Sequence, residues 1–134
     1  VLSASKCLSA DVNSAFDPNY ADAFDKNNAS YVNRGVAISK YTGSRGKSGA
    51  SDAGAEYLAE IRKILDDAKV CWQTGELGKV DLGGGGTVAK FVAMLNVDVV
   101  DIGVPVLSMH APFEVVGKAD IYAAYRAFSE FYKA

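Results

Sequence analysis

An α/β fold with three layers, α/β/α, around a mostly parallel or mixed central sheet is predicted by two features of this 134-residue sequence. Apolar segments rich in β-branched residues alternate with segments in which apolar residues recur every three or four positions. The first pattern is typical of buried strands, and the second of helices that cover a sheet. Because no repeat, low-complexity tract or linker interrupts this order, we predict a single domain over residues 1–134.

The composition is that of an ordinary globular protein and excludes several function classes. Hydrophobic residues make up 49% and charged residues 22%, and the formal net charge is −2. This charge gives no electrostatic basis for binding nucleic acid or an anionic membrane, and no apolar run approaches the ~20 residues that span a bilayer. Cys7 and Cys71 lack metal-site spacing, so we expect reduced thiols in a cytoplasmic protein.

The first third of the sequence predicts two strands joined by a polar segment. Residues 1–12 are expected to form a strand that ends near Asp11, and a polar segment with a turn signal at Asp17-Pro18-Asn19 follows. Residues 35–41 alternate in the manner of a strand. Residues 43–49 combine glycine, serine and basic residues, which predicts a loop. The motif GSRGKS in this loop has too few residues between its two glycines to form a nucleotide-binding P-loop.

The middle of the chain predicts an amphipathic helix that begins near Ser51 or Asp52 and ends near Ala68. Ser and Asp are good N-cap residues, and Glu56 places a carboxylate in the first turns. One side of this helix should be buried, because its apolar residues recur at three- and four-residue spacing. These residues are Tyr57, Leu58, Ile61, Ile64 and Leu65.

The remaining chain predicts strands and helices in alternation. Residues 69–74 are expected to be a strand, and the glycine run at 83–86 with Thr87 should open a helix that ends near Asn96. Residues 97–109 form one bent strand or two short strands, broken around Gly103 and Pro105. Residues 120–132 form a last amphipathic helix, with Ile121, Tyr125, Phe128 and Tyr132 on one side.

Asp11 and His110 are the candidate chemical groups at predicted strand ends, where ligands gather in α/β domains. A carboxylate at the end of an apolar strand is costly to bury without a partner, so Asp11 is either a cap for the following turn or a ligand for a cation. His110, the only histidine, is either a hydrogen-bonded structural group or a metal ligand. The glycine run either admits another molecule to the backbone or permits tight packing of strand and helix.

Three segments together resemble a known family in order and spacing. They are SADVNSAFDPNY from Ser9, GGGGTVAKFVA from Gly83 and VDIGVPVLSMHAPFE from Val100. This set resembles the C-terminal part of the aspartyl aminopeptidase / aminopeptidase I family of dinuclear-zinc metallopeptidases, and KYTGSRGKSGASDA resembles its bacterial branch. Eukaryotic members carry histidines shortly after the matching aspartate, where this chain has Ser14 and Asp17.

The resemblance implies site residues position by position. Asp11 would be a terminal ligand of one metal ion and His110 a ligand of the other, so the two side chains are expected to converge on one pocket that holds cations. Lys40 would be an active-site lysine, and Gly85, Gly86 and Thr87 would line the substrate site. Glu114 would either orient a neighbouring group or cap the final helix. The other metal ligands and the general-base glutamate lie upstream in the family, so the resemblance implies no catalytic residue within this chain.

The implied activity is hydrolysis of the N-terminal residue from peptides by a hydroxide bound to two metal ions, since paired divalent ions can also polarise the scissile carbonyl. Zn²⁺ is the implied cofactor, with Mn²⁺ or Co²⁺ as alternatives, and the family implies a homo-oligomer, a dodecamer. The 134-residue chain would be the C-terminal portion of the catalytic domain and inactive by itself. A rival interpretation is a non-catalytic module that captures a small anion at the Gly83–Gly86 helix terminus, and a third is a purely structural fragment.

Overall fold

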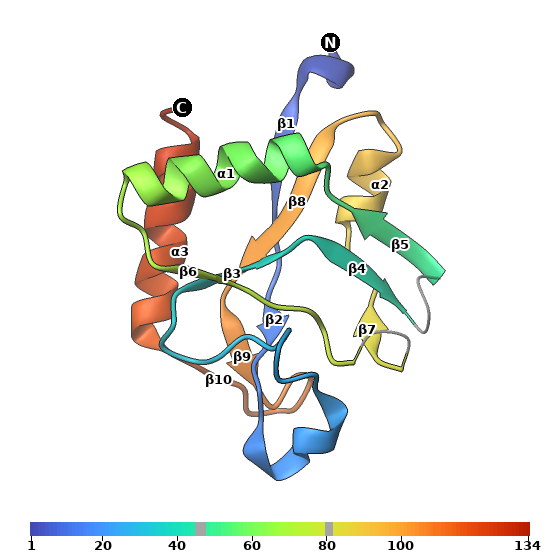
Figure 1. Cartoon of the computed structure of the whole chain (residues 1–134), viewed down its shortest axis with the longest axis vertical. Coiled ribbons are helices and arrows are strands. Elements are labelled where there is room, and N and C mark those ends of the chain that lie inside the picture. The colour runs from blue at the N-terminus through green and yellow to red at the C-terminus, as the bar shows by residue number, and fades with distance from the viewer. Residues whose placement is uncertain (45–47, 80–81) are drawn as a thin grey trace.

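The computed structural model describes residues 1–44, 48–79 and 82–134, and its centre is a four-stranded mixed sheet (Figure 1). The strand order is β1 (Lys6–Ala10), β8 (Asp98–Gly103), β3 (Val36–Ser39) and β6 (Trp72–Thr74). β1 is parallel to β8, β3 is antiparallel to β8, and β6 is parallel to β3. Each of these strands lies within a predicted strand segment, and the mixed sheet confirms the predicted α/β class.

The first strand pair continues beyond the central sheet. β1 leads into β2 (Asn13–Ser14) and β8 leads into β9 (Pro105–Leu107), so that the parallel pairing of β1 with β8 resumes as β2 with β9. The two short strands predicted around Gly103 and Pro105 are therefore confirmed. β10 (Val115–Val116) pairs with β9 and completes this second sheet.

A third sheet corrects the loop predicted over residues 43–49. Its strands are β5 (Ser48–Asp52), β4 (Tyr41–Ser44) and β7 (Gly84–Gly85). Residues at both ends of the expected loop are strand residues, because β4 and β5 pair antiparallel. Residues 45–47, which include part of the GSRGKS motif, lie outside the described residues. The glycine run was expected to open a helix, but Gly84 and Gly85 form a strand against β4.

Helices α1 (Ala55–Asp67) and α3 (Lys118–Phe131) contribute to one hydrophobic core against the central sheet. Ile38 of β3 and Ile102 of β8 pair across the sheet and belong to this core. The apolar stripe of α1 is buried as its spacing predicts, with Tyr57, Ile61 and Leu65 in the core and Leu58 and Ile64 packed against it. α1 begins after Gly54 rather than at Ser51 or Asp52, because these two residues pair with β4.

The buried face of α3 differs from the expected one. Ala123 and Ala127 are buried, whereas Ile121, Tyr125 and Tyr132 are 49%, 67% and 84% exposed. Small side chains let the helix backbone approach the core closely, which leaves the aromatic side facing outward. Of the residues expected on one side, Phe128 is the one that packs against the core.

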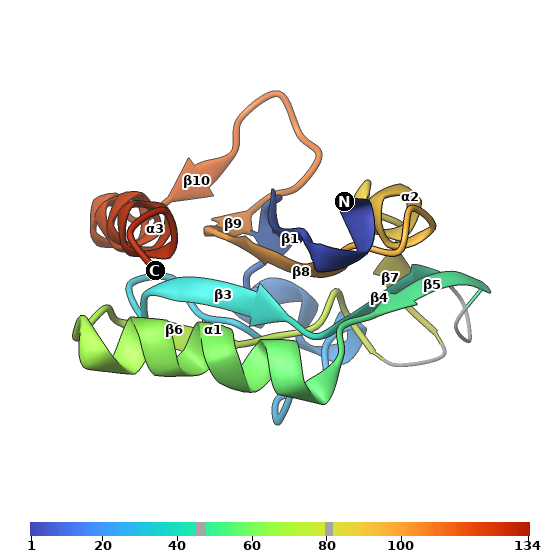
Figure 2. The ribbon, with the colours of Figure 1, turned by 90° about the horizontal axis from the view of Figure 1, so that it is seen from above.

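The third helix lies on the other face of the sheet. α2 (Ala89–Ala93) is shorter than predicted and follows Thr87, whose hydroxyl bonds to Asp101 of β8. Because successive strand residues face opposite sides, Asp101 points away from the core that contains Ile102. The structure therefore has the predicted three layers, and α2 and α3 lie at opposite ends of the molecule in Figure 2. None of the helices in the described part of the chain is long and apolar enough to cross a membrane.

Two polar anchors fix the segments between strands. Asp120, in the first turn of α3, is fully buried and accepts hydrogen bonds from the backbone N–H groups of Asn33 (2.6 Å) and Gly35 (2.8 Å). The buried Asn13 side chain donates to Ser39 Oγ (2.7 Å) and accepts from Ser30 Oγ (2.6 Å). The hydrogen bonds of Asn13 hold the polar segment that contains the short 3₁₀ helix η2 (Pro18–Ala23) against the sheet. Another 3₁₀ helix, η1 (Leu2–Ala4), precedes β1.

Candidate active site

Asp11 lies where β1 gives way to β2, beside the junction of β8 and β9. The two backbone segments approach so closely here that a Cβ atom on Gly103 would lie 1.4 Å from the carbonyl oxygen of Asp11. Only glycine fits this crossing. The Asp11 carboxylate is partly exposed, and its Oδ1 accepts a hydrogen bond from the backbone N–H of Val12 (2.8 Å). This bond joins adjacent residues and is not the contact two residues on that caps a turn, and Oδ2 has no protein partner among the described residues.

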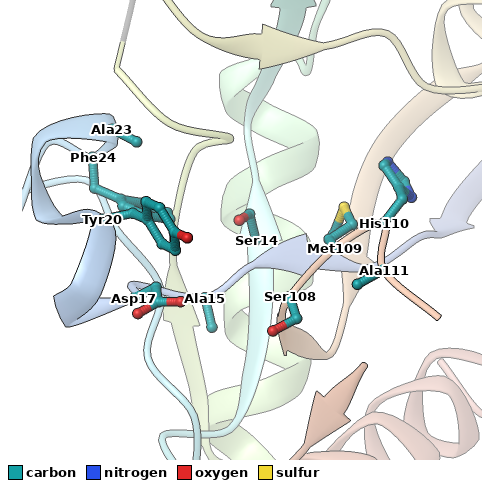
Figure 3. Close-up of a pocket in the computed structure, with 10 residues that line it drawn as sticks. All are labelled: Ser14, Ala15, Asp17, Tyr20, Ala23, Phe24, Ser108, Met109, His110 and Ala111. Atoms are coloured by element: carbon teal, nitrogen blue, oxygen red, sulfur yellow. The ribbon is translucent and has the colours of Figure 1, made fainter. Parts of the chain in front are cut away.

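His110 lies on the wall of a cavity of about 480 Å³ (Figure 3). Ser108, Met109 and His110 form one side of this cavity, and Tyr20 and Phe24 from the η2 region form the other. Within the described part of the chain, neither imidazole nitrogen makes a hydrogen bond, and the residue is exposed. His110 is therefore not the hydrogen-bonded structural histidine that was the alternative prediction.

The donor atoms of these two residues suit a divalent cation, because imidazole nitrogen and carboxylate oxygen are the usual ligands of catalytic zinc. Asp11 lines a different cavity, formed with Val104 of the β8–β9 junction and Phe128 of α3. In the described residues no three side chains of the His, Cys, Asp or Glu type gather into a metal site. Asp11 and His110 are thus separate candidate ligands, and the described side chains do not by themselves assemble a metal centre.

Lys40 follows β3 and forms an ion pair with Asp52 at the end of β5. Both side chains are largely exposed, so the pair adds little to stability. Glu76, nearby, is a partly buried carboxyl that the sequence did not single out. Burial raises the pKa of Glu76 to about 7; the carboxylates of Asp52 and Asp101 add to this effect, and Lys40 and a backbone N–H of Tyr41 oppose it.

Thr87 is held by Asp101 from the middle strand of the sheet. Thr87 Oγ1 donates to Asp101 Oδ2 (2.8 Å) and accepts from the backbone N–H of Ala89 (3.2 Å). Asp101 is buried, and burial raises the pKa of its carboxyl; hydrogen bonds from the Ser9 and Thr87 side chains oppose this effect, and the charge of Asp11 adds to it.

Gly85 and Gly86 precede Thr87 in the chain. Gly85 pairs with Gly43 of β4, and a Cβ atom on Gly86 would meet the Nζ atom of Lys90 at 3.8 Å. These contacts neither assign nor exclude a substrate at the loop, so its role stays a prediction. Among the described residues, β7 replaces the helix terminus on which the anion-binding interpretation of the run depended.

Glu114 is exposed and lies just before β10. The N-cap of α3 is Gly117, so the predicted helix-capping role of Glu114 is wrong. Its role in orienting a neighbouring group stays a prediction. Cys7 and Cys71 are both free thiols, as predicted.

Tyr20, Glu76 and Asp101 are site-region residues that sequence reasoning missed. Tyr20 belongs to a polar segment without periodicity, and Glu76 lies in a turn after β6. Asp101 carried a signal, since a charged residue interrupts the apolar run VDVVDIGV, but strand alternation alone did not say that it would be buried.

The sequence model of the family described as "Aminopeptidase I zinc metalloprotease (M18)" matches residues 1–132. The chain belongs to this family. Its curated relatives include a probable M18 family aminopeptidase 1 of Clostridium acetobutylicum, 54% identical over 127 residues, and one of Thermotoga maritima, 49% identical over 133 residues. These matches cover 95% and 97% of this chain but only 27% and 30% of the relatives, so the M18 chain spans less than a third of their length.

Solved M18 structures share the fold. The crystal structure of aminopeptidase I from Clostridium acetobutylicum superposes with a TM-score of 0.91 at 54% identity, over 95% of this chain and 28% of that chain. An M18 aminopeptidase from Thermotoga maritima superposes with a TM-score of 0.93 at 47% identity, over 96% of this chain and 29% of that chain. The family named by the sequence resemblance is therefore confirmed.

Proposed function

We propose that this chain is the C-terminal portion of the catalytic domain of a metal-dependent aminopeptidase, which removes the N-terminal residue from peptides. The match of residues 1–132 to the M18 family carries this proposal, because it covers nearly the whole chain. Asp11 and His110 supply one ligand each to two divalent ions, with zinc as the resident metal. Peptides are the substrates, and the working protein is a cytoplasmic homo-oligomer.

The uncommitted donor atoms support the metal assignment. His110 presents an imidazole without a hydrogen-bond partner in the described residues, and Asp11 has one carboxylate oxygen in the same condition. Two divalent ions would supply the Lewis acidity that activates water and polarises the scissile carbonyl. The remaining ligands and the general base come from the rest of the full-length protein, so the chain by itself contributes binding and orientation.

The chain's own residues define the surroundings of the reaction. Lys40 provides a cation whose position is restrained by Asp52, and Thr87 provides a hydroxyl held by Asp101. The cavity beside His110 gives space for the substrate's first side chain, and Tyr20 and Phe24 form an apolar wall there. Asp17 lines the same cavity, so its carboxylate makes the site less favourable for acidic first residues.

Substitution of the two ligands tests the proposal in the full-length protein. Asp11→Asn and His110→Ala should each lower hydrolysis of N-terminal residues by at least roughly a hundredfold, since losing a ligand removes metal-assisted catalysis. Each variant should also bind less metal by elemental analysis while its circular dichroism stays unchanged. Lys63→Gln, which breaks an exposed ion pair on α1, is the control. Wild-type turnover and metal content in both ligand variants would refute the assignment.

A further inference from the structure

Asp17 is the only Asp, Glu, Lys or Arg among the described residues that line the cavity of about 480 Å³ beside His110. It belongs to the η2 region, which faces Met109 and His110 across this cavity (Figure 3). Oδ1 of Asp17 accepts a hydrogen bond from the backbone N–H of Asn19 (2.9 Å). Asp17 is thereby the N-cap of η2, and this bond restrains the position of its carboxylate.

The second oxygen of this carboxylate is uncommitted. Asp17 is partly buried, and its Oδ2 has neither a hydrogen-bond nor an ion-pair partner within the described residues. Lys40, the cation among the candidate site residues, is paired with Asp52 and is not one of the described residues around this cavity. The cavity therefore carries one negative charge that a cationic ligand group would compensate.

The walls next to Asp17 are apolar and aromatic. Phe24 packs edge-on against Phe16, with ring centroids 5.5 Å apart, so a second ring holds it in place. Tyr20 is 71% exposed, and its hydroxyl points toward the cavity in Figure 3, with Met109 on the opposite wall. Such walls suit methylene groups, and the face of a tyrosine ring attracts a cation. A flexible aliphatic chain that ends in a cation matches both properties of the cavity.

The position of His110 on the cavity wall indicates which part of a peptide enters the cavity. In the proposed function, His110 binds one of the ions at which the first residue is removed. The α-amine, the scissile carbonyl and the first side chain all branch from one Cα atom, so the first side chain begins beside His110. The adjoining cavity is the space available to it.

We propose that Asp17 selects peptides whose first residue is lysine or arginine. The aliphatic stem of this residue lies against Phe24 and Met109, and its cation lies at Asp17 and Tyr20. This inference rests on the proposed aminopeptidase function and extends it by naming the substrate class. Acidic first residues are repelled by Asp17, and norleucine, which has the stem of lysine without the ammonium group, gains only the apolar contacts.

Peptides that begin with lysine or with norleucine test the inference in the full-length, metal-loaded protein, since they differ by the ammonium group alone. Wild type should have a kcat/KM about tenfold higher for the lysine peptide, as expected for one charge-assisted hydrogen bond at a partly exposed carboxylate. Asp17→Asn should lower this ratio to about one, and asparagine is also a good N-cap for η2. Asp17→Ser, a second uncharged N-cap, should give the same ratio.

Asp22→Asn is the matched control. Asp22 is an exposed carboxylate of the same η2 region, and it is not among the described residues that line the cavity beside His110. The ratio of kcat/KM for lysine over norleucine should therefore stay at the wild-type value in this variant. Higher ionic strength should lower the ratio in wild type and leave it unchanged in Asp17→Asn, because salt screens the charge of Asp17.

Binding provides a second measurement that does not depend on turnover. The Kd values of lysine hydroxamate and norleucine hydroxamate, measured by calorimetry, should differ about tenfold in wild type and be equal in Asp17→Asn. Equal kcat/KM for the two peptides in wild type, or an unchanged ratio in Asp17→Asn, would overturn the inference while the aminopeptidase function stands. A wild-type protein that hydrolyses neither these peptides nor peptides with other first residues would overturn both.

Discussion

At the residue scale, the sequence was most informative where a single side chain interrupts an apolar segment. Asp11 and His110 were both predicted at the ends of strands; Asp11 directly follows β1, whereas His110 lies in a turn beyond the end of β9. The convergence of these two residues in one pocket was also expected, and the structure instead places them against separate cavities. Spacing along the chain identifies strand ends, whereas the direction of each side chain depends on the local crossing of β1–β2 with β8–β9.

Glu76 gives a prediction about pH at this scale. Its pKa rises from 4.5 to about 7 in the folded protein, so between these values the folded protein keeps a proton that the unfolded chain has released. Stability should therefore fall as pH rises through this window. Glu76→Gln removes this pH-dependent loss of stability, because glutamine does not ionise. It should stabilise the protein above pH 7 by on the order of 1–2 kcal/mol, after allowance for partial exposure.

Urea denaturation of the full-length protein across the window measures this difference. The stability gain of Glu76→Gln should be absent at acid pH and grow toward neutral pH. Glu56→Gln, which neutralises an exposed carboxylate in the first turn of α1, should show no such growth. A gain for Glu76→Gln that is the same at every pH would contradict the predicted titration.

At the scale of the element, apolar periodicity predicted what packs against the core and failed where backbone pairing decides the structure. α1 was predicted well because its stripe is regular. α2 and β7 were not, because a run of glycines has no side chains from which a helix and a strand can be told apart. For α3 the aromatic side was the natural choice for a core face, but two alanines allow closer packing against the sheet.

The attachment of α3 depends on Asp120. Both of its carboxylate oxygens accept backbone N–H groups from the segment before β3, and the residue is completely buried. Asp120→Ala should lower the free energy of opening of α3 by about 2–4 kcal/mol, because two buried donors lose a charged acceptor. Hydrogen exchange of the α3 amides in the full-length protein measures this. Asp67→Asn, at an exposed ion pair on α1, should change it by no more than ~0.5 kcal/mol. Equal exchange in wild type and Asp120→Ala would refute the anchoring role.

At the scale of the whole molecule, the layered α/β architecture followed from the order of strands and helices, because that order restricts how elements can cover a sheet. Packing carries no information on the length of the relatives, of which the chain covers 27–30%. In the proposed function the remaining ligands lie in a part of the relatives that this chain does not cover, and Asp11 and His110 are only two of the ligands.

The 134-residue chain alone is predicted to hydrolyse no peptide, because two ligands from separate cavities cannot hold a metal pair. The measurement is turnover of N-terminal residues by the isolated chain with zinc, manganese or cobalt added, beside the full-length protein under the same conditions. Circular dichroism of the isolated chain is recorded in parallel, so that loss of structure is recognised. Metal-dependent turnover by the isolated chain would show that the site lies wholly within it.

The crossing at Gly103 limits how this region can be altered. Even the methyl group of alanine would overlap the carbonyl oxygen of Asp11, so neither random variation nor deliberate engineering has a tolerated alternative at this position. A library that randomises the neighbourhood of Asp11 to change metal preference or selectivity should keep this one codon constant, and its diversity belongs on the open side of the carboxylate.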